Sequence, residues 1–413
     1  MAQTIRHASA CKPRSIPVVA DVTPDDWDRV QSFSPAISQP KEKVYEIGRL
    51  DHMDFDKDTL EATLSVNQLE YGTLASILQA AGLIANPASG VALSDYDDAR
   101  TDFYLPGKDE YAGSVEQTLW LQKMSLDAFG LEISAEERLV RTFDFSGEYA
   151  KILREGNKYL IFKEDDAPSG TSGNYVIDLS DPAPVEDPNN SGVYILQIYR
   201  IRSGTATELS LTTDYTYNNG TKELTIISAS AADNYRIWYS AASYGTSGDP
   251  TSLNDVDDYY LGAENVKVEI YDGTHTAVEL TKLTSLTIGA SLNRIEEAVI
   301  GATEKVLKDV ESYDVTCSFD GFVKNSTIEE VLMAQAGQSW GIIDFTLLQA
   351  VSVSVKIYQE NTKSTFLIGY KMTNLEFDDE SQDYNANEFA SNPINLSGSN
   401  LIVSTDETDI TLA

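Results

Sequence analysis

The feature that most constrains this chain is a pattern that occurs twice. The stretch from Val44 to Gly82 returns in altered form between Ala298 and Gly337. Four identical pairs lie at one constant spacing of 253 residues with no gap, namely Gly48 and Gly301, Asp56 and Asp309, Thr63 and Thr316, and Ser65 and Ser318. Constant spacing is typical of a duplicated unit, so the sequence predicts two copies of one fold.

Each copy continues into the pattern of a short helix. Thr73 stands at the N-cap position before Leu74–Ala81, and Gly82 stands where the helix would end. The same signals recur over Thr327–Gly337. A looser third match, at a spacing of 244 residues, sets Leu131 against Leu375 and Phe145 against Phe389.

Charge and cysteine content narrow the function classes. The chain has 413 residues, enough for two or three domains, and carries 65 acidic against 30 basic residues for a formal charge of −35. Such a charge repels phosphate, so specific binding of nucleic acid is not expected. The two cysteines cannot build a disulfide framework, and Cys317 lies in a strand pattern typical of a buried small residue, whereas Cys11 lies near the N-terminus. With no apolar run of about 18 residues, we expect no membrane anchor.

The order of patterns along the chain predicts four parts. These are an extended N-terminal arm at 1–40, a first unit at 41–155, a β-rich insert at 156–250 and a second unit at 251–413. The arm is predicted from its prolines, and a long loop is predicted from Ala85 to Asp109. Short alternating runs separated by turns indicate the strands of the insert, at 175–179, 193–201, 223–227 and 235–239.

The predicted fold is therefore mainly β. We expect two tandem β-sandwich or β-barrel domains, each with one short α-helix, joined through the β-rich insert. Long helices are not expected, because no apolar pattern at helical spacing extends beyond the two short segments.

The strand pair from Gly48 to Ser65, the helix at Leu74–Ala81, the loop that begins at Ala85 and the N-terminal arm together resemble the tube domain of tailed-phage tail tube proteins. In that family six tube domains form a ring with a continuous inner β-barrel, and members with a duplicated domain form trimeric rings. Immunoglobulin-like inserts also occur on the outer surface of such tubes, so the resemblance implies that residues 156–250 could be one.

The resemblance also implies a function. The chain would be a structural virion protein, a tail tube subunit that assembles in the host cytoplasm into stacked trimeric, pseudo-hexameric rings. Its partners would be other copies of itself, a tape measure protein, a tail terminator and distal tail or baseplate proteins. Double-stranded DNA would pass through the lumen without specific binding, and an acidic wall would repel it.

Residues that could form a chemical site are few. The acidic cluster Asp51, Asp54, Asp56 and Asp58 fails as a calcium loop, because Thr59 replaces the required glycine and Ser65 the final glutamate. The histidines, His7, His52 and His275, lie in unrelated contexts, and the acidic pairs Glu136-Glu137 and Glu296-Glu297 are typical of a solvated surface. We therefore expect no catalytic residue, no metal, no cofactor and no enzyme activity.

Two alternatives remain open. A secreted β-rich adhesin or glycan-binding module could use the tyrosines that cluster in the insert, although tyrosine is also a common cross-strand residue. These are Tyr194, Tyr199, Tyr215, Tyr217, Tyr235, Tyr239 and Tyr244. An acidic capsid decoration protein is the other alternative, and it would differ in not forming rings by itself.

Overall fold

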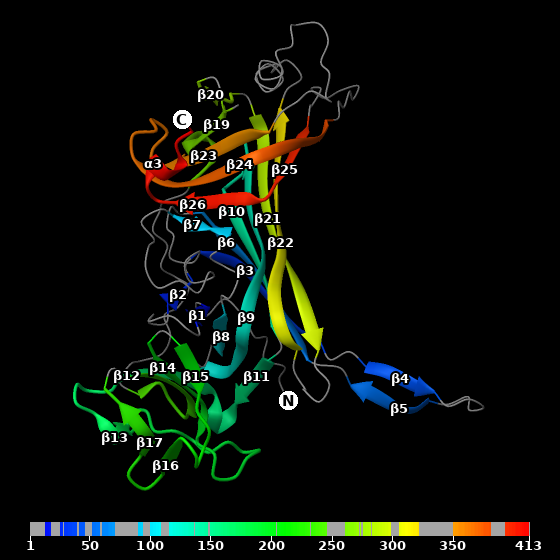
Figure 1. Ribbon diagram of the computed structural model, residues 1–413. Helices are drawn as coiled ribbons and strands as arrows, with labels where there is room; N and C mark the ends of the chain where they lie inside the picture. Colours follow the sequence, from blue (N-terminus) through cyan, green and yellow to red (C-terminus); the bar gives the residue numbers. More distant parts are fainter. Residues whose placement is uncertain are drawn as a thin grey trace, which may run out of the picture. The chain divides into compact units, whose positions relative to one another are not determined.

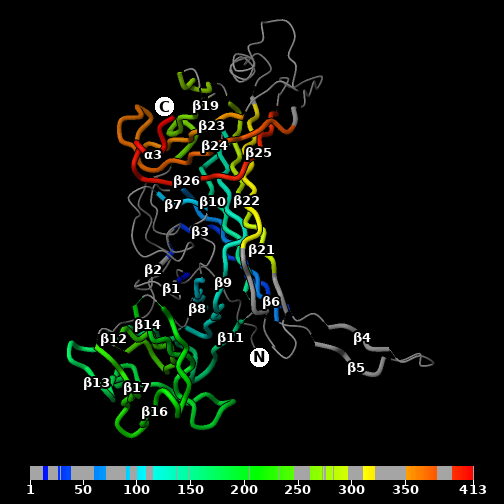
Figure 2. Tube along the Cα trace, in the orientation of Figure 1, coloured from blue at the N-terminus to red at the C-terminus, as the bar shows by residue number. Residues whose placement is uncertain are grey.

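The structure is a computed structural model, and its fold is mainly β, as predicted (Figure 1). It describes residues 13–17, 25–27, 29–38, 41–45, 52–57, 60–70, 90–93, 100–108, 115–245, 261–271, 273, 276–298, 305–321, 350–380 and 393–412, except 136, 148, 204, 232 and 282. The grey parts of the trace in Figure 2 mark the remainder. The predicted helices at 74–81 and 327–337 lie outside the described residues.

The chain divides into two compact units. Unit 1 holds residues 1–28, 100–124 and 147–256, and unit 2 holds residues 29–99, 125–146 and 257–413. This division crosses the predicted boundaries, because the strand β9 (Val115–Ser134) contributes its first half to one unit and its second half to the other.

Unit 1 contains a short sheet and the insert. The short sheet of the first repeat has the order β2-β1-β8-β9-β11, and all its pairs are antiparallel. Its other strands are β1 (Arg14–Pro17), β2 (Asp25–Asp26), β8 (Thr101–Lys108) and β11 (Tyr149–Arg154). A 3-10 turn at Glu155–Asn157 leads from β11 into the insert.

The insert is a sandwich of seven strands. One sheet has the order β12-β18-β14-β15 and the other has the order β13-β17-β16. The strands are β12 (Tyr159–Asp166), β13 (Ser172–Asp178), β14 (Ile195–Arg202), β15 (Thr205–Glu208), β16 (Tyr215–Asn218), β17 (Glu223–Ser230) and β18 (Asn234–Ala241). The immunoglobulin fold pairs its first strand with its second, whereas here the first strand pairs with the seventh, so the strand order is not that of an immunoglobulin domain.

Tyrosines fill the core of this sandwich. Five of the seven clustered tyrosines are buried, namely Tyr199, Tyr215, Tyr235, Tyr239 and Tyr244. The rings of the other two, Tyr194 and Tyr217, contact each other with centroids 5.1 Å apart. Four of the buried tyrosines therefore pack between the two sheets, whereas Tyr199 packs against the short sheet of the first repeat, and the cluster does not form an open aromatic face.

In the described residues, unit 2 is built on a long sheet of eight strands. Its order is β3-β6-β10-β9-β21-β22-β25-β24. The strands not yet given are β3 (Val30–Ser38), β6 (Glu61–Leu69), β10 (Val140–Gly147), β21 (Leu283–Ala298), β22 (Lys305–Gly321), β24 (Phe366–Glu380) and β25 (Ile394–Gly398). A hairpin of β4 (Lys41–Tyr45) and β5 (His52–Lys57) connects β3 to β6 along the chain.

A short sheet of the second repeat completes unit 2. Its order is β20-β19-β23-β24-β26-β7. The strands are β7 (Val91–Ala92), β19 (Val266–Tyr271), β20 (Val278–Glu279), β23 (Val351–Tyr358) and β26 (Asn400–Ser404), and a four-residue helix, α3 (Glu407–Ile410), follows β26.

The strand pairing repeats residue by residue at the predicted spacing of 253. Ser34 pairs with Ser65 as Thr287 pairs with Ser318. The turn ends match too, since Tyr45 pairs with His52 as Ala298 pairs with Lys305. The irregularities recur at the same positions, with register shifts at 30/32 and 44/45 and again at 283/285 and 297/298.

The later strands repeat at spacings of 250 and 251. Thr101 pairs with Met124 as Val351 pairs with Leu375, and Lys151 pairs with Trp120 as Ile402 pairs with Lys371. Even the backbone irregularity is shared, because Lys123 in β9 and Asn374 in β24 both have positive φ, at 53° and 56°. Each lies where its strand passes from a short sheet into the long sheet.

The third sequence match is wrong. Phe145 pairs with Leu126 in the first repeat, and the corresponding pair in the second repeat is Leu396 with Phe377. The spacing here is therefore 251 and not 244, so Phe145 corresponds to Leu396. Alternating apolar residues match one another in many alignments, and the hydrogen-bonded register, which is not visible in the sequence, selects the correct one.

Two further predictions differ from the structure. The stretch predicted as an extended arm, residues 1–40, contains β1, β2 and β3, and Ile16 is fully buried. Pro35 is compatible with β3 because that strand lies at the edge of the long sheet. The long loop predicted from Ala85 to Asp109 is wrong over β8, where Pro106 and Gly107 interrupt an otherwise strand-like pattern.

Candidate assembly surface

The two repeats meet along one pair of strands inside the long sheet. β9 of the first repeat pairs with β21 of the second, from Ser134 opposite Ser285 to Ala128 opposite Ser291. Each repeat contributes four strands in the same internal order, β3-β6-β10-β9 and β21-β22-β25-β24. The long sheet is therefore two equivalent modules placed side by side.

The outer edges of this sheet are the counterparts of that junction. β3 corresponds to β21, and β24 corresponds to β9. Within the described residues, β3 pairs only with β6, and the part of β24 in the long sheet pairs only with β25. β3 therefore has the backbone arrangement with which β21 pairs with β9, and β24 has the arrangement with which β9 pairs with β21. The two outer edges are thus complementary to each other.

One face of the long sheet is apolar and covered. Side chains alternate along the strands, and the inward positions are buried. They include Ala62, Leu64, Val66, Phe129, Leu131, Ile133, Phe143, Phe145, Leu286, Ile288, Ala290, Val315, Cys317, Phe319, Leu375, Ile394 and Leu396. Cys317 is fully buried, as its strand pattern predicted, and burial raises the pKa of its thiol well above the usual range.

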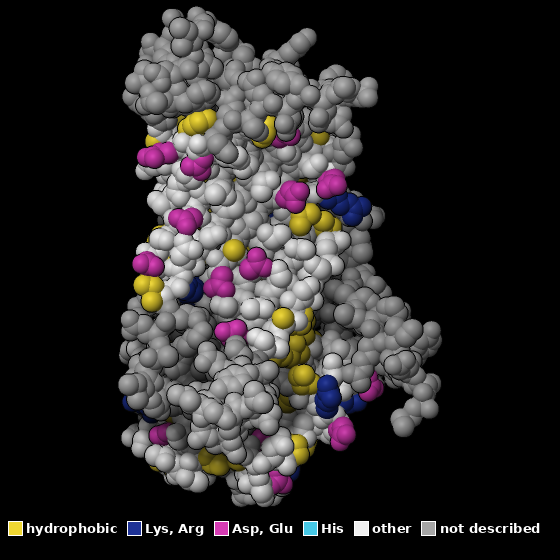
Figure 3. All heavy atoms as spheres, turned by 90° about the vertical axis from the view of Figure 1, so that its right-hand side faces the viewer, with side chains coloured by type: hydrophobic (Ala, Val, Ile, Leu, Met, Phe, Trp, Pro, Cys, Tyr) yellow, Lys and Arg dark blue, Asp and Glu magenta, His cyan; other side chains and the backbone are white. Residues whose placement is uncertain are grey.

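The opposite face is polar, with small, hydroxyl, amide and acidic side chains. Its charged positions are Glu61, Glu132, Asp144, Asp314, Asp320, Glu376 and Asp378. Among the described residues of 61–66, 128–134, 140–146, 285–293, 314–320, 375–378 and 394–398, the only basic one is Arg141, which is buried on the covered face. Figure 3 shows Asp and Glu side chains scattered over a surface that is otherwise largely uncharged.

Hydrogen bonds between neighbouring strands order this polar face. The Ser65 hydroxyl donates to Asp144, and at the corresponding place in the second repeat the Ser318 hydroxyl donates to Asn395 Oδ1 over 2.6 Å. The Ser397 hydroxyl donates to Asp378 Oδ1 over 2.8 Å. These hydrogen bonds hold the Asp144 and Asp378 carboxylates in place on the sheet.

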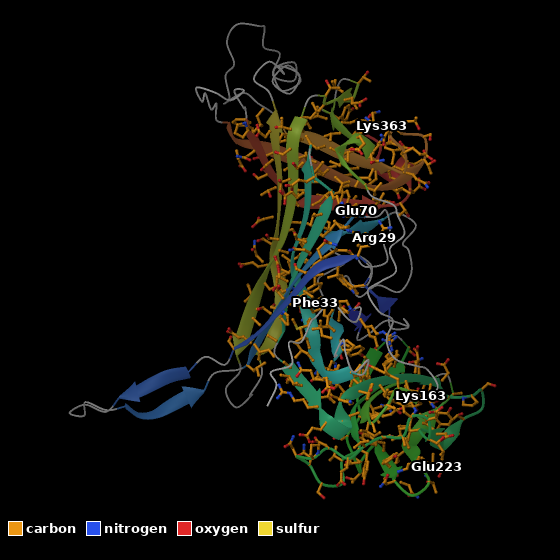
Figure 4. All side chains as sticks on the ribbon, turned by 180° about the vertical axis from the view of Figure 1, so that it is seen from behind. Arg29, Phe33, Glu70, Lys163, Glu223 and Lys363 are labelled. Carbon is orange, nitrogen blue, oxygen red and sulfur yellow. The ribbon has the colours of Figure 1, made fainter. Side chains whose placement is uncertain are left out.

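A buried ionic cluster fastens the long sheet to the short sheet of the second repeat. Arg141 Nε lies 3.2 Å from Glu70 Oε2, and both side chains are fully buried. The Tyr370 hydroxyl donates to the same Glu70 oxygen over 2.5 Å, and Arg141 also donates to Gln68 over 3.1 Å. Burial and the Glu70 charge hold the pKa of Tyr370 well above its usual range. Figure 4 labels Glu70 at the end of β6.

Where the structure describes them, the residues considered as chemical sites lie on different elements. His52, Asp54 and Asp56 lie on β5, and Glu137 is exposed after β9, whereas Glu296 and Glu297 lie on β21. Asp51, Asp58, His7, His275, Cys11 and Glu136 lie outside the described residues. In the part of the chain that the structure describes, no group of three His, Cys, Asp or Glu residues could hold a metal ion.

Sequence reasoning missed the edge strand β3 and therefore the complementary edges. The sequence contained a signal for this strand, because the repeat spacing of 253 aligns residues 30–38 with residues 283–291, which show a clear strand pattern. The prolines of the arm concealed it.

Comparison with known proteins identifies no family. No family model matches the chain, and no curated protein matches it. Among solved structures, one match is a chain of the anti-feeding prophage baseplate, with 10% identity and a TM-score of 0.28, covering 37% of this chain and 97% of that one. A TM-score this low carries no argument. None of the described helices is long and apolar enough to cross a membrane.

Proposed function

We propose that this chain is a structural subunit of a phage-type tail tube, and that copies of it close into rings through the edges of the long sheet. The observation that supports this most directly is the complementarity of β3 and β24. An edge that fits a different edge of the same molecule makes a head-to-tail interface, and such interfaces generate closed rings when the rotation permits.

The internal junction supplies the register of the proposed interface. Ala128 opposite Ser291 in the β9–β21 pair corresponds to Asp379 of one chain opposite Ser38 of the next. Three chains would supply six modules and twenty-four strands, the arrangement that the resemblance to tail tube proteins implies. Stacking of such rings would produce a tube.

The polar face of the long sheet fits the wall of a DNA conduit. Fixed carboxylates and the lack of basic side chains at the described positions of that face would repel phosphate, so DNA would pass without being held. Such a tube needs no catalysis and no cofactor. Tape measure, terminator and distal tail or baseplate proteins would meet the tube inside and at its ends.

Microscopy combined with a cysteine pair tests this proposal. In a Cys11→Ser background, Ser38→Cys with Asp379→Cys should give interchain disulfides, because residues directly opposite in antiparallel strands have Cβ atoms about 4.5–5.5 Å apart. Ala128→Cys with Ser291→Cys is the matched control, and it should give a disulfide within one chain. Purified protein should form rings or hollow tubes by negative stain. Dispersed monomers at high concentration, with no interchain disulfide, would overturn the proposal.

A further inference from the structure

The outer edge of the second repeat's short sheet is covered by a segment from the first repeat (Figure 1). Val91 pairs with Val403 and Ala92 pairs with Ile402, so β7 adds a short antiparallel strand to β26. Gly90 precedes this strand with a φ of +78°, and a Cβ there would lie 2.6 Å from the carbonyl oxygen of Val403. A strand that covers this edge therefore needs a glycine before its pairing residues. At the covered edge Val403 is only 3% exposed.

The corresponding edge in the first repeat is open within the described residues. β11 corresponds to β26, with Ile152 at the position of Val403 and Lys151 at the position of Ile402. Among the described strands β11 pairs only with β9, and Ile152 is 49% exposed. A large apolar side chain beside an open strand edge is typical of a strand-addition site.

A groove runs beside this open edge. It has a volume of about 500 Å³, and its walls come from β11 and from the insert. Lys151, Ile152 and Arg154 line one side, and Asp187 and Asn190 line the other. The open edge therefore faces a hollow that a short added strand can enter.

The edge strand also carries positive charge. Lys151 and Arg154 are both exposed, and the Lys151 ammonium lies over the Trp120 ring, 5.3 Å from its centroid. In the register of β7 on β26, the residue after the glycine would lie opposite Ile152 and the next one opposite Lys151, whereas the residue before the glycine would lie opposite Arg154. Opposite charges attract across paired strands, so acidic residues fit the two positions that face the cations.

We propose that β11 binds an extended acidic segment of another protein, which adds to it as an antiparallel strand. The segment would contain an acidic residue, a glycine, a large apolar residue and a second acidic residue, in that order. Its apolar side chain would lie beside Ile152, as Val91 lies opposite Val403. β11 belongs to the short sheet, so the site does not use the edges of the long sheet and does not depend on ring closure.

Disulfide trapping of a synthetic peptide on the full chain tests the position of this site. In a Cys11→Ser background, Ile152→Cys should form a mixed disulfide with the peptide Thr-Asp-Gly-Cys-Glu-Val-Thr, because directly opposed residues fall within disulfide reach. Val176→Cys is the matched control, since Val176 is also 49% exposed and lies on β13, the edge strand of its own sheet. Trapping at Ile152→Cys should exceed that control about tenfold.

Changes in the peptide test the mode of binding and the charge. Replacing its glycine by valine should reduce trapping about tenfold, since the close approach needs glycine. Replacing its two acidic residues by lysine should reduce trapping about fivefold, and combining Lys151→Glu with Arg154→Glu in the protein should reverse this preference.

Each contrary outcome is distinct. Equal trapping at Ile152→Cys and Val176→Cys, or no loss with the valine peptide, would overturn strand addition at β11. A charge preference that is the same in the Lys151→Glu, Arg154→Glu protein would overturn the acidic partner. Disulfide-linked dimers of Ile152→Cys in the absence of peptide would place a second copy at this edge and also overturn the proposal. Ring formation is measured separately, so any of these failures would leave the proposed tube standing.

Discussion

The short sheets of the two repeats share their backbone pairing but differ on their outer faces. Tyr104, Trp120 and Leu153 of the first repeat pack against the insert, where Leu160 and Trp238 meet them. The residues at the corresponding positions of the second repeat are Ser354, Lys371 and Ser404. Lys371 there donates to the carbonyl oxygens of Asp409 and Thr411, at 3.2 and 3.0 Å, beside α3.

This difference shows what the backbone pairing and the side chains each determine. The hydrogen-bonded register, including its bulges, is the same in both repeats, although most side chains have changed. The side chains instead differ according to the segment that packs on each sheet. They are apolar under the insert and polar beside the C-terminal segment. The insert is thus accommodated by substitutions on one face of a conserved pattern of strand pairing.

The largest loss of stability is expected from removing the Trp120 side chain, which packs against the insert. Trp120 is fully buried, and its indole N–H donates to Asp102 Oδ2 over 3.1 Å. Trp120→Ala should lower the free energy of unfolding of unit 1 by about 3–5 kcal/mol, the usual cost of a large core cavity. The control at the corresponding position, Lys371→Ala, should cost about 1 kcal/mol, because it removes hydrogen bonds at a partly exposed site. Urea unfolding measures both, and equal losses would contradict the comparison.

The buried ionic cluster gives the next largest effect, because its members come from both repeats. Glu70 and Arg141 belong to the first and Tyr370 to the second, where the first repeat has Leu119 at the corresponding position. Arg141→Met should cost about 3 kcal/mol or more, since it leaves the Glu70 charge buried without its cation. Tyr370→Phe removes one hydrogen bond and should cost about 1–2 kcal/mol.

A double variant separates charge from packing in this cluster. Adding Glu70→Gln to Arg141→Met removes the orphaned charge, so the double variant should be more stable than Arg141→Met alone. A double variant that is less stable by the full sum of both single losses would show that the ion pair has no special role.

Asp102 offers a pH-dependent test of the same outer face. Burial raises its pKa from 3.8 to about 7, against the hydrogen bonds from Lys123 N and Trp120 Nε1 and the nearby Lys123 charge, while Glu208 reinforces the rise. The corresponding residue in the second repeat, Ser352, carries no charge. Between these two pKa values, Asp102 therefore keeps its proton in the folded state and has lost it in the unfolded chain.

The sign of the expected effect follows from that proton. Between about pH 4 and pH 7 the folded state binds more protons than the unfolded state, so the contribution of Asp102 to the free energy of unfolding falls as pH rises. The wild type should lose stability relative to Asp102→Asn across this window and remain level above it. Urea unfolding of both proteins at a series of pH values measures this difference, and a relative gain by the wild type would contradict the raised pKa.

Much of the repeat could be predicted from the sequence, and the parts that could not be predicted have physical causes. The spacing of 253 was visible because the hairpin from Gly48 to Ser65 was duplicated without insertions. The later spacing was misjudged, because Phe145 and Leu396 share only their apolar character. The complementary edges were missed, because Pro35 suggested an arm, although a proline is tolerated on an edge strand. Which carboxylates share one face became clear only from the register.

The smallest expected effect compares one cross-strand hydrogen bond in its two versions. Ser65 donates to the Asp144 carboxylate and Ser318 to the Asn395 amide oxygen, at corresponding places on the polar face. A charged acceptor makes the stronger bond, so Ser65→Ala should cost at most about 1 kcal/mol and Ser318→Ala about half of that. Double-mutant cycles with Asp144→Ala and Asn395→Ala measure the two coupling energies, and a larger coupling for Ser318 with Asn395 would contradict this ranking. Equal couplings would mean that the carboxylate adds nothing to stability at this site, and the acidity of the face would then need another reason, such as the repulsion of phosphate in the proposed tube.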